Sequence, residues 1–247
     1  MKVIPVKTHK ISPNEDLLGI LDKYITELPD KSVVAVTSKI VATSEGRVVR
    51  IEDADKDELI KQESQYYLPR EANPYRVSLT ITNNTLIAGA GIDESNANGN
   101  YILWPKNAQD SANKIREHLV EKSGKENIGV IITDSKTTPL RWGVTAISIA
   151  FSGFEPLIDY IGTEDLFGRK FVFETMSVMD NLASAAAFVM GEGSEQTPIS
   201  IISDIPHIVF TRRNPTQQEL DKLKISVEED LYSPIIQKAD WKRGDKA

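Results

Sequence analysis

Residues 128–132, Ile-Gly-Val-Ile-Ile, form an uninterrupted apolar run that constrains the fold more than any other stretch of the sequence. A short apolar run rich in β-branched residues is typical of a strand buried in a sheet. The polar residues 133–135, Thr-Asp-Ser, follow directly at its carboxyl end. Residues 33–36 predict a second buried strand, which ends in the same way at Thr37-Ser38-Lys39. The fold is therefore expected to contain strands that present polar side chains at their ends.

Strands and helices alternate irregularly along the rest of the chain. Further strands are predicted at residues 1–6, 76–87 (with a turn at Asn83-Asn84), 101–105, 171–173 and 199–202. Helices are predicted at residues 14–25 with Asn14 as cap, 53–64, from Asp110 or Ser111 to Gly124, from a cap at Asp180 to Met190, and 215–231. Residues 40–49 are expected to form two apolar segments joined by a turn.

This order of elements predicts an α+β fold with mixed or antiparallel sheets and packed helices, in one or two lobes, rather than a doubly wound sheet. We expect one domain over residues 1–235. Residues 236–247 are expected to form a C-terminal tail that is loosely held from Asp240 onward.

Composition excludes several kinds of chemistry. The chain has no cysteine, which rules out disulfides, thiolate metal sites and a cysteine nucleophile. Its 36 acidic and 29 basic residues give a net charge of −7, and no run of Lys and Arg exceeds two, so nucleic acid is not expected as a partner. No apolar run approaches the roughly 18 residues of a membrane span. A cytoplasmic location is the resulting expectation.

The segment from Gly89 to Asn96 is the first candidate for a functional site. An apolar strand leads into two glycines, and Asp93, Glu94 and Ser95 follow. Glycine permits a sharp turn or a close approach to a ligand. Carboxylate and amide oxygens placed after such a turn can hold a hard cation and contact phosphate. Taken alone, however, the segment is more typical of a solvated polar turn.

Three acidic residues stand where a predicted element meets a polar or glycine-rich segment, and they are Asp93, Asp134 and Glu192. Oxygen ligands of this kind suit Mg²⁺ or Mn²⁺. Arg141, which follows a proline, could clamp a carboxylate or a phosphate with two hydrogen bonds. The sequence contains neither the glycine pattern of a P-loop nor that of a Rossmann site. It also lacks a spacing of serine, histidine and acid that would argue for acyl-enzyme chemistry.

An ordered set of motifs resembles the coenzyme F-420-0:γ-glutamyl ligase family, and the resemblance runs from about Val3 to Ile202. The motifs are Thr37-Ser38-Lys39-Ile40-Val41 with Glu45-Gly46-Arg47, Ala90-Gly91-Ile92-Asp93-Glu94-Ser95-Asn96, Leu103-Trp104-Pro105, Ile132-Thr133-Asp134-Ser135, Pro139-x-Arg141-x-Gly143, Asp165-x-Phe167-Gly168-Arg169 and Met190-Gly191-Glu192. Each motif is weak alone, but their common order is specific.

The resemblance implies a GTP-dependent, metal-dependent ligase that joins L-glutamate to an acceptor carboxylate. In that family the acceptor carboxylate becomes an acyl phosphate, and attack by the glutamate amine then gives an amide, GDP and phosphate. The implied cofactors are one or two Mg²⁺ or Mn²⁺ ions, with K⁺ as a further candidate. The implied assembly is a homodimer with an α+β fold.

The resemblance also implies roles for individual residues. Asp93 and Asp134 resemble metal ligands at the catalytic centre, where Arg141 is a further catalytic candidate. Ser135 and Glu192 complete the implied metal set. The implied nucleotide contacts are Thr8, His9, Lys10, Ile11, Ser38, Lys39, Asn96, Gly191, Glu192 and Gly193.

Two departures from the family pattern leave the acceptor open. Thr43 stands where the family commonly has lysine, and Thr137-Thr138 stands where it commonly has Gly-Arg. Each lost charge-assisted contact costs about 1.5–3 kcal/mol. Either Lys10 or Lys136 replaces the lost charge, or the acceptor is folate-like and carries less phosphate, or the chain binds a nucleotide without catalysis. The choice between GTP and ATP and the number of glutamates added also stay open.

Overall fold

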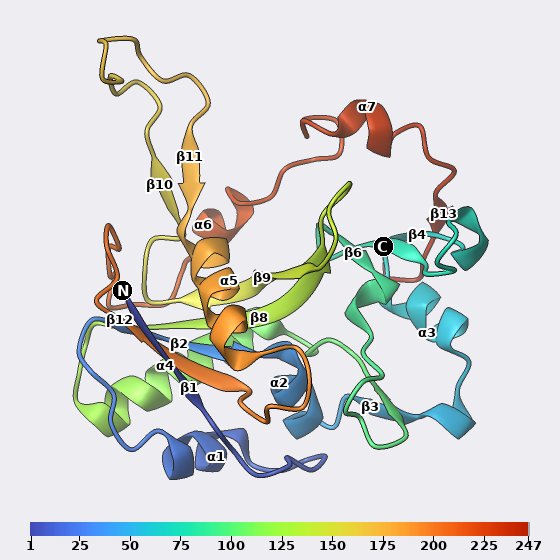
Figure 1. Cartoon of the computed structure of the whole chain (residues 1–247), viewed down its shortest axis with the longest axis horizontal. Helices are drawn as coiled ribbons and strands as arrows, with labels where there is room; N and C mark the ends of the chain where they lie inside the picture. Colours follow the sequence, from blue (N-terminus) through green and yellow to red (C-terminus); the bar gives the residue numbers. More distant parts are fainter. Residues whose placement is uncertain (247) are drawn as a thin grey trace.

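The structure, a computed structural model, describes residues 1–246 and is organised around a five-stranded sheet (Figure 1). Its strands lie in the order β1 (Lys2–Val6), β12 (Ile199–Ser203), β2 (Ser32–Thr37), β8 (Ile128–Thr137) and β9 (Val144–Ser152). Only β2 and β8 are parallel, and the other pairs in this sheet are antiparallel. The predicted α+β fold with mixed sheets is thereby confirmed.

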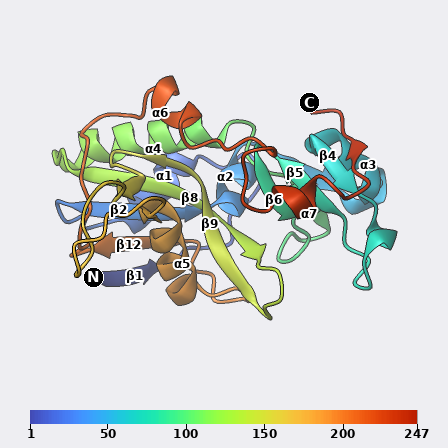
Figure 2. The ribbon, with the colours of Figure 1, turned by 90° about the horizontal axis from the view of Figure 1, so that it is seen from above.

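Helices cover both faces of this sheet (Figure 2). Helices α1 (Leu17–Tyr24) and α4 (Ala108–Ser123) pack on one face, and α5 (Val178–Met190) packs on the other. Val34 and Val36 of β2 pack on the face covered by α1 and α4, whereas Val33 and Ala35 pack on the face covered by α5. A strand covered on both sides needs apolar residues at every position, which explains the unbroken apolar runs in the sequence.

A second, four-stranded sheet lies at the other end of the molecule (Figure 2). It consists of β13 (Lys242–Arg243), β4 (Tyr66–Leu68), β5 (Leu79–Thr82) and β6 (Thr85–Ala88), with α3 (Lys56–Glu63) beside it. The pair β3 (Val48–Arg50) and β7 (Asn100–Ile102) and helix α2 (Ser38–Ser44) connect this region to the main sheet. The predicted hairpin turn at Asn83-Asn84 joins β5 and β6, with both residues at positive φ.

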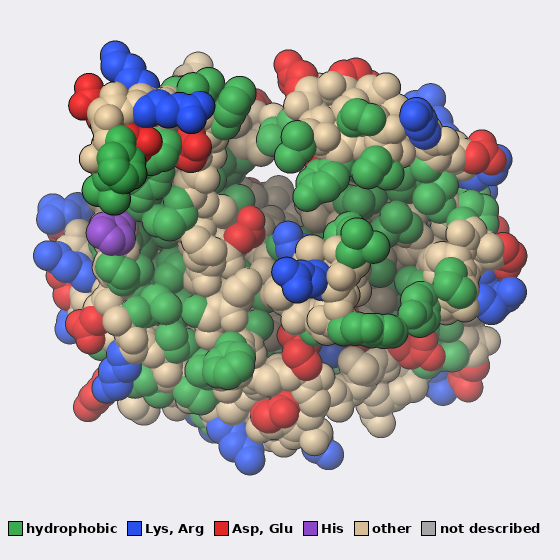
Figure 3. Space-filling model, turned by 45° about the horizontal axis from the view of Figure 1, so that its top comes forward, with side chains coloured by type: hydrophobic (Ala, Val, Ile, Leu, Met, Phe, Trp, Pro, Cys, Tyr) green, Lys and Arg blue, Asp and Glu red, His purple; other side chains and the backbone are tan. Residues whose placement is uncertain are grey.

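The pair β10 (Leu157–Asp159) and β11 (Thr175–Ser177) begins an arm that projects from the main sheet (Figure 1). Leu166, Phe167 and Phe173 of the arm are exposed. On the face drawn in Figure 3, hydrophobic side chains lie among charged ones. None of the helices within residues 1–246 combines the length and the apolar character that a membrane crossing requires.

Several predicted helix boundaries are wrong because another polar side chain forms the cap. Asp16, not Asn14, caps α1, and its carboxylate accepts from the Leu18 amide. Helix α5 begins after Ser177, whose hydroxyl accepts from the amide of Asp180. Helix α4 begins at Ala108 after Asn107. The predicted end of α4 at Gly124 is confirmed, with that glycine in the left-handed conformation.

A turn joins two apolar segments within residues 40–49, as predicted, and the structure shows that they belong to helix α2 and strand β3. Three further predictions of local structure are wrong. The carboxylate of Glu174 accepts from the amides of Val172 and Phe173, which occupies donors that a strand at 171–173 would use. Residues 215–231 hold only the short helix α6 (Gln217–Asp221), and α7 (Ser233–Ile236) follows. The tail is not loose between residues 242 and 246, because β13 pairs with β4 and the amides of residues 244–246 bond to residues 61–65.

Candidate functional site

The parallel pair β2 and β8 places two polar segments side by side. Thr37 is in register with Thr133, so both strands end at the same edge of the main sheet. Ser38 and Lys39 begin α2 directly after β2, and Asp134 continues along β8. Because the carboxyl ends of parallel strands share one edge, segments as distant in the sequence as Thr37 and Thr133 contribute to one site.

The antiparallel strands β1 and β12 bring two more loops to this edge. Val6 at the end of β1 pairs with Ile199 at the start of β12. Residues 8–11, which follow β1, therefore lie beside residues 191–198, which precede β12. The Thr8 amide donates to the Gln196 carbonyl at 3.1 Å, which joins the two loops directly.

A loop from the second sheet forms the facing wall. After β6, the turn Gly89–Gly91 has all three residues at positive φ. The backbone of Asp93 then exchanges two 2.8 Å hydrogen bonds with Ile102 of β7. Asn96 Nδ2 donates to the Gly193 carbonyl at 2.8 Å, so this loop also contacts the segment that leads to β12.

These segments enclose a cavity of about 800 Å³, which lies within the size range of small-molecule and cofactor sites. Most residues that the sequence nominated for the site line this cavity. They are Thr8, His9, Lys10, Ile11, Ser38, Lys39, Asp93, Asn96, Asp134, Ser135, Gly191, Glu192 and Gly193. The structure thus brings these residues together, and the role of each one stays a prediction.

Arg141 is the nominated residue that does not line the cavity. It lies at the exposed tip of the hairpin between β8 and β9. Thr138 and Lys136 belong to the same hairpin and are also absent from the cavity wall. Lys10 and Thr43 do line the cavity, and the Thr43 hydroxyl donates to the Lys39 carbonyl at 2.7 Å. Of the two proposed replacement cations, only Lys10 is therefore in the cavity.

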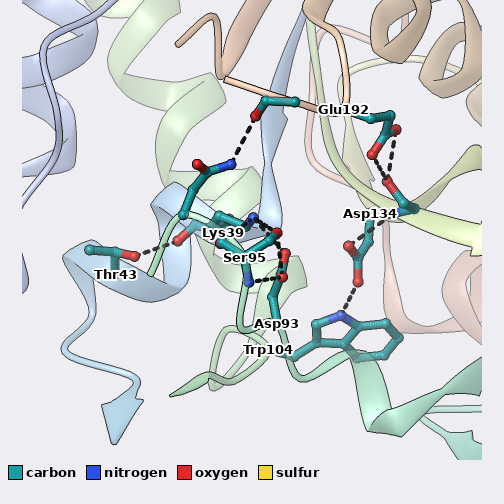
Figure 4. Close-up of polar contacts among 10 residues, drawn as sticks. Lys39, Thr43, Asp93, Ser95, Trp104, Asp134 and Glu192 are labelled. Atoms are coloured by element: carbon teal, nitrogen blue, oxygen red, sulfur yellow. Dashed lines mark hydrogen bonds and ion pairs between the residues drawn. The ribbon is translucent and has the colours of Figure 1, made fainter. Parts of the chain in front are cut away.

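Lys39 and Asp93 form an ion pair in the cavity (Figure 4). Lys39 Nζ lies 2.6 Å from Asp93 Oδ2 and donates to the carbonyl and hydroxyl oxygens of Ser95. Ser95 in turn donates its amide and hydroxyl to Asp93 Oδ1. Burial of the Asp93 carboxyl opposes ionisation, but the lysine and these hydrogen bonds outweigh it and lower the pKa of Asp93.

At Asp134, burial outweighs the hydrogen bonds, so the pKa of this carboxyl shifts in the opposite direction. Burial of its carboxyl raises the pKa of Asp134 to about 6, although the Trp104 indole and the Ser135 amide both donate to it. The negative charge of Asp93 adds to the increase. The charge of Asp134 is thus disfavoured by its surroundings, and a cation bound nearby would favour the ionised form.

Glu192 meets Ser135 across the cavity (Figure 4). The Ser135 hydroxyl lies 2.9 Å and 2.8 Å from the two oxygens of the Glu192 carboxylate. This contact joins β8 to the loop after α5. Together with the bond from Asn96 to Gly193, it connects that loop to both walls of the cavity.

The donor set fits a hard divalent cation without forming a complete cage. No three His, Cys, Asp or Glu side chains within residues 1–246 are grouped as a ready metal site. Mg²⁺, however, is usually bound through one or two carboxylates together with water and substrate phosphates. Asp93, Asp134 and the Ser135 hydroxyl offer oxygen donors in one cavity. These residues could hold such an ion beside a bound phosphate.

Some cavity residues were not found by sequence reasoning. Val48, Asn98, Asn100 and Ile102 line the cavity but belong to β3, β7 and the turn before β7. The contact of Trp104 with Asp134 was also missed, although Trp104 belongs to a motif that the sequence singled out. No spacing rule predicts either result, because both depend on how the two sheets pack together.

The fold and the cavity define an α+β protein whose candidate site lies where two sheets meet and combines carboxylates, hydroxyls and a lysine. The chain belongs to the family described as F420-0:Gamma-glutamyl ligase, whose model matches residues 5–204. This family match confirms the resemblance drawn from the sequence motifs.

Proteins with a shared name are similar to this chain over most of its length. It is 34% identical to the coenzyme F420:L-glutamate ligase of Methanococcus maripaludis (strain C7), over 94% of this chain and 97% of that protein. This chain is 31% identical to the protein of the same name from Methanosarcina barkeri (strain Fusaro), over 87% of this chain and 91% of that protein. It is 30% identical to the protein of the same name from Archaeoglobus fulgidus, over 82% of this chain and 87% of that protein.

Proposed function

We propose that this protein is a GTP-dependent ligase that forms an amide between the amino group of L-glutamate and a carboxylate of F-420-0 or a related acceptor. The observation that carries the proposal is the convergence of Asp93 and Asp134 in one cavity of about 800 Å³. The family membership supports the type of reaction, because the relatives are named glutamate ligases.

The proposed reaction has two steps. An oxygen of the acceptor carboxylate attacks the γ-phosphorus of GTP, and the bond to the bridging oxygen breaks with GDP as the leaving group. The glutamate amine then attacks the carbonyl carbon of the acyl phosphate, inorganic phosphate leaves, and the nitrogen loses a proton. Neither step needs a protein nucleophile, which agrees with a chain that has no cysteine. Positioning and charge neutralisation provide the catalysis.

The residues of the cavity have distinct tasks in this scheme. Asp93, Asp134 and Ser135 would hold one or two Mg²⁺ or Mn²⁺ ions, with Glu192 as a further ligand and K⁺ as an additional candidate ion. A divalent cation supplies neutralising charge at the β- and γ-phosphate oxygens. Lys39 and Asn96 contact phosphate or ribose, and residues 8–11 close the far end of the site around the nucleotide.

The test is an assay of the full chain with Mg²⁺ or Mn²⁺, GTP or ATP, L-glutamate and a panel of acceptors. The expected result is release of GDP that requires both glutamate and acceptor, with a product heavier by one or more glutamate residues in the mass spectrum. Chelation with EDTA is expected to abolish turnover, and added Mg²⁺ to restore it. No glutamate-dependent release of nucleoside diphosphate with any acceptor would refute the proposal.

A folate-like acceptor is the second candidate, because Thr43 leaves an uncharged position in the cavity wall. An acceptor with less phosphate needs fewer cations there. Turnover with a folyl γ-glutamate but not with F-420-0 would select this candidate. Binding of GDP and metal without turnover of any acceptor would instead indicate a non-catalytic nucleotide-binding protein.

Replacing Lys39 with methionine is expected to lower kcat/KM for GTP about ten- to a hundredfold. A charge-assisted hydrogen bond contributes about 1.5–3 kcal/mol, and the variant removes the cation that lies 2.6 Å from Asp93. The matched control is Lys56→Met, which removes an ion pair with Glu94 at 2.9 Å outside the cavity wall. Steady-state kinetics at varied GTP measure the effect. Equal kinetics for both variants would contradict a phosphate contact for Lys39.

We also propose that the protein is a homodimer. The support is the projecting arm, on which Leu166 and Phe167 are 97% and 93% exposed. Large apolar side chains on an extended arm are costly in water unless another surface covers them. Light scattering on the purified chain is expected to give twice the 27.5 kDa mass of one copy. A monomeric mass at micromolar concentration would contradict this proposal.

A further inference from the structure

The Trp104 side chain fills the junction between the two sheets. Trp104 follows β7, is 3% exposed, and packs against Ile87 of β6 and Ile147 of β9. Because β6 belongs to the four-stranded sheet and β9 to the main sheet, one ring contacts both parts of the fold that form the cavity. Trp104 is therefore placed where it can fix the two walls relative to each other.

The indole of Trp104 also points its polar edge at the candidate site (Figure 4). Trp104 Nε1 donates to Asp134 Oδ2, while the Ser135 amide donates to Asp134 Oδ1 at 2.9 Å. Each carboxylate oxygen thus accepts a hydrogen bond from a fixed group, and the Ser38 side chain is a further donor to this carboxylate. The carboxylate is held in one orientation and keeps lone-pair capacity for a ligand.

The same ring lies against the loop that carries Asp93. A Cβ atom on Gly91 would lie 2.1 Å from Trp104 Nε1, a distance that atoms cannot adopt without displacement. Gly91 also has a φ of +71°, which favours glycine. Gly91 lies two residues before Asp93 in the chain. The backbone of the Asp93 loop and the side chain of Asp134 therefore share Trp104 as a neighbour.

The backbone of Trp104 is itself fixed. Arg47 Nε donates to the Trp104 carbonyl at 3.0 Å, and Arg47 Nη2 forms a 2.7 Å ion pair with Glu63. Pro105 restricts the chain directly after the tryptophan. The indole N–H is thus presented from a rigid segment rather than from a mobile loop.

We propose that Trp104 is a positioning residue that sets the spacing and orientation of the Asp93 and Asp134 carboxylates for a divalent cation. This inference rests on the proposed function, because it assumes that the two carboxylates bind the ion. Groups that hydrogen-bond to metal ligands fix the orientation of those ligands, and their loss typically weakens metal binding by about 10–100-fold. Gly91 is the glycine that permits the close approach of the ring.

The test compares Trp104→Phe with Trp241→Phe in the full chain. Both changes remove an indole N–H and keep an aromatic ring, but Trp104 Nε1 donates to Asp134, whereas Trp241 Nε1 donates to the Ile236 carbonyl at 2.7 Å. Binding of Mn²⁺ alone is measured by electron paramagnetic resonance of the free ion. Trp104→Phe is expected to weaken Mn²⁺ binding about 10–100-fold, and Trp241→Phe to leave it within twofold of the original chain.

A second variant and a second measurement separate positioning from packing. Gly91→Ala keeps every oxygen ligand but displaces the indole, so it is also expected to weaken Mn²⁺ binding. In ¹H–¹⁵N spectra the chain has three indole N–H signals, and the one missing in Trp104→Phe is expected to shift when Mg²⁺ is added. A role in packing alone would lower the melting temperature of Trp104→Phe without these effects.

The Mn²⁺ measurements distinguish failure of the positioning role from failure of the proposed ligase activity. Folded Trp104→Phe that binds Mn²⁺ as tightly as Trp241→Phe would overturn the positioning role and leave the proposed ligase activity intact. An original chain that binds no Mn²⁺ would overturn the positioning role, whereas the effect of EDTA on turnover decides the metal requirement separately. If Gly91→Ala fails to fold, the comparison of the two tryptophan variants still decides the question.

Discussion

Replacement of Asp134 with asparagine is expected to lower glutamate-dependent release of nucleoside diphosphate by on the order of 10³-fold or more. Loss of one group that neutralises charge in phosphoryl transfer has effects of that size. The change keeps the shape of the side chain and removes the charge that a cation would need. Steady-state turnover at saturating GTP, glutamate and acceptor measures the loss. Circular dichroism is expected to show an unchanged fold, because asparagine still offers an oxygen to the Trp104 indole.

The neighbouring acidic residues provide the controls for this prediction. Asp93→Asn is expected to cause a loss of similar size, because the second carboxylate faces the same cavity. Glu94→Gln is the matched control from the same motif. Its carboxylate pairs with Lys56 at 2.9 Å and does not line the cavity, so turnover is expected to stay within about twofold. Full activity in Asp134→Asn, or equal loss in Glu94→Gln, would reject the metal role of these aspartates.

The strands at the centre of the fold were predictable because burial on both faces leaves a clear pattern. Residues 33–36 and 128–132 fall within β2 and β8, as their apolar runs predicted. The parallel pairing of these strands was not predictable, because about 90 residues separate them and the pairing depends on contacts distant in sequence. Helix α2 was missed for a related reason. Its β-branched residues, such as Ile40 and Val41, disfavour a helix intrinsically, and packing against the main sheet outweighs that preference.

Most residues nominated from the sequence line the cavity, but the position of Arg141 and the contact of Trp104 with Asp134 were not predicted. Strand ends at one edge of a sheet converge, so Ser38, Lys39 and Asp134 could be assigned to one site from the order of elements and the family motifs. Arg141 follows Asp134 by only seven residues, yet it lies on an exposed hairpin tip because β8 and β9 extend beyond the sheet. Closeness in sequence to a site residue is therefore a weak guide when a strand continues past the site. The hydrogen bond from Trp104 to Asp134 required the packing of two sheets, which no local pattern encodes.

Replacement of Phe154 with alanine is expected to have the largest effect on stability, a loss of about 3–5 kcal/mol in the free energy of unfolding. Phe154 is 1% exposed and packs between the main sheet and α5, with its ring 5.6 Å from that of Phe151. Its removal leaves a cavity that rigid neighbours cannot fill. Urea unfolding followed by fluorescence measures the change. Phe188→Ala is the matched control, because this ring on α5 is 90% exposed and its loss is expected to change stability by less than about 0.5 kcal/mol.

Gly129 provides an internal check on the physical reason for the loss at Phe154. A Cβ at position 129 would lie 2.7 Å from Phe154 Cδ1 and 2.9 Å from Val33 Cγ2. Gly129→Ala alone therefore overpacks this interface and is expected to cost about 1–3 kcal/mol. In Phe154→Ala the added methyl group has space, so the double variant is expected to lose less stability than the two single losses added together. Residues in direct contact typically couple by about 0.5–3 kcal/mol. Strict additivity would mean that the ring and the glycine do not compete for the same space, and the attribution of the loss to that packing would then be wrong.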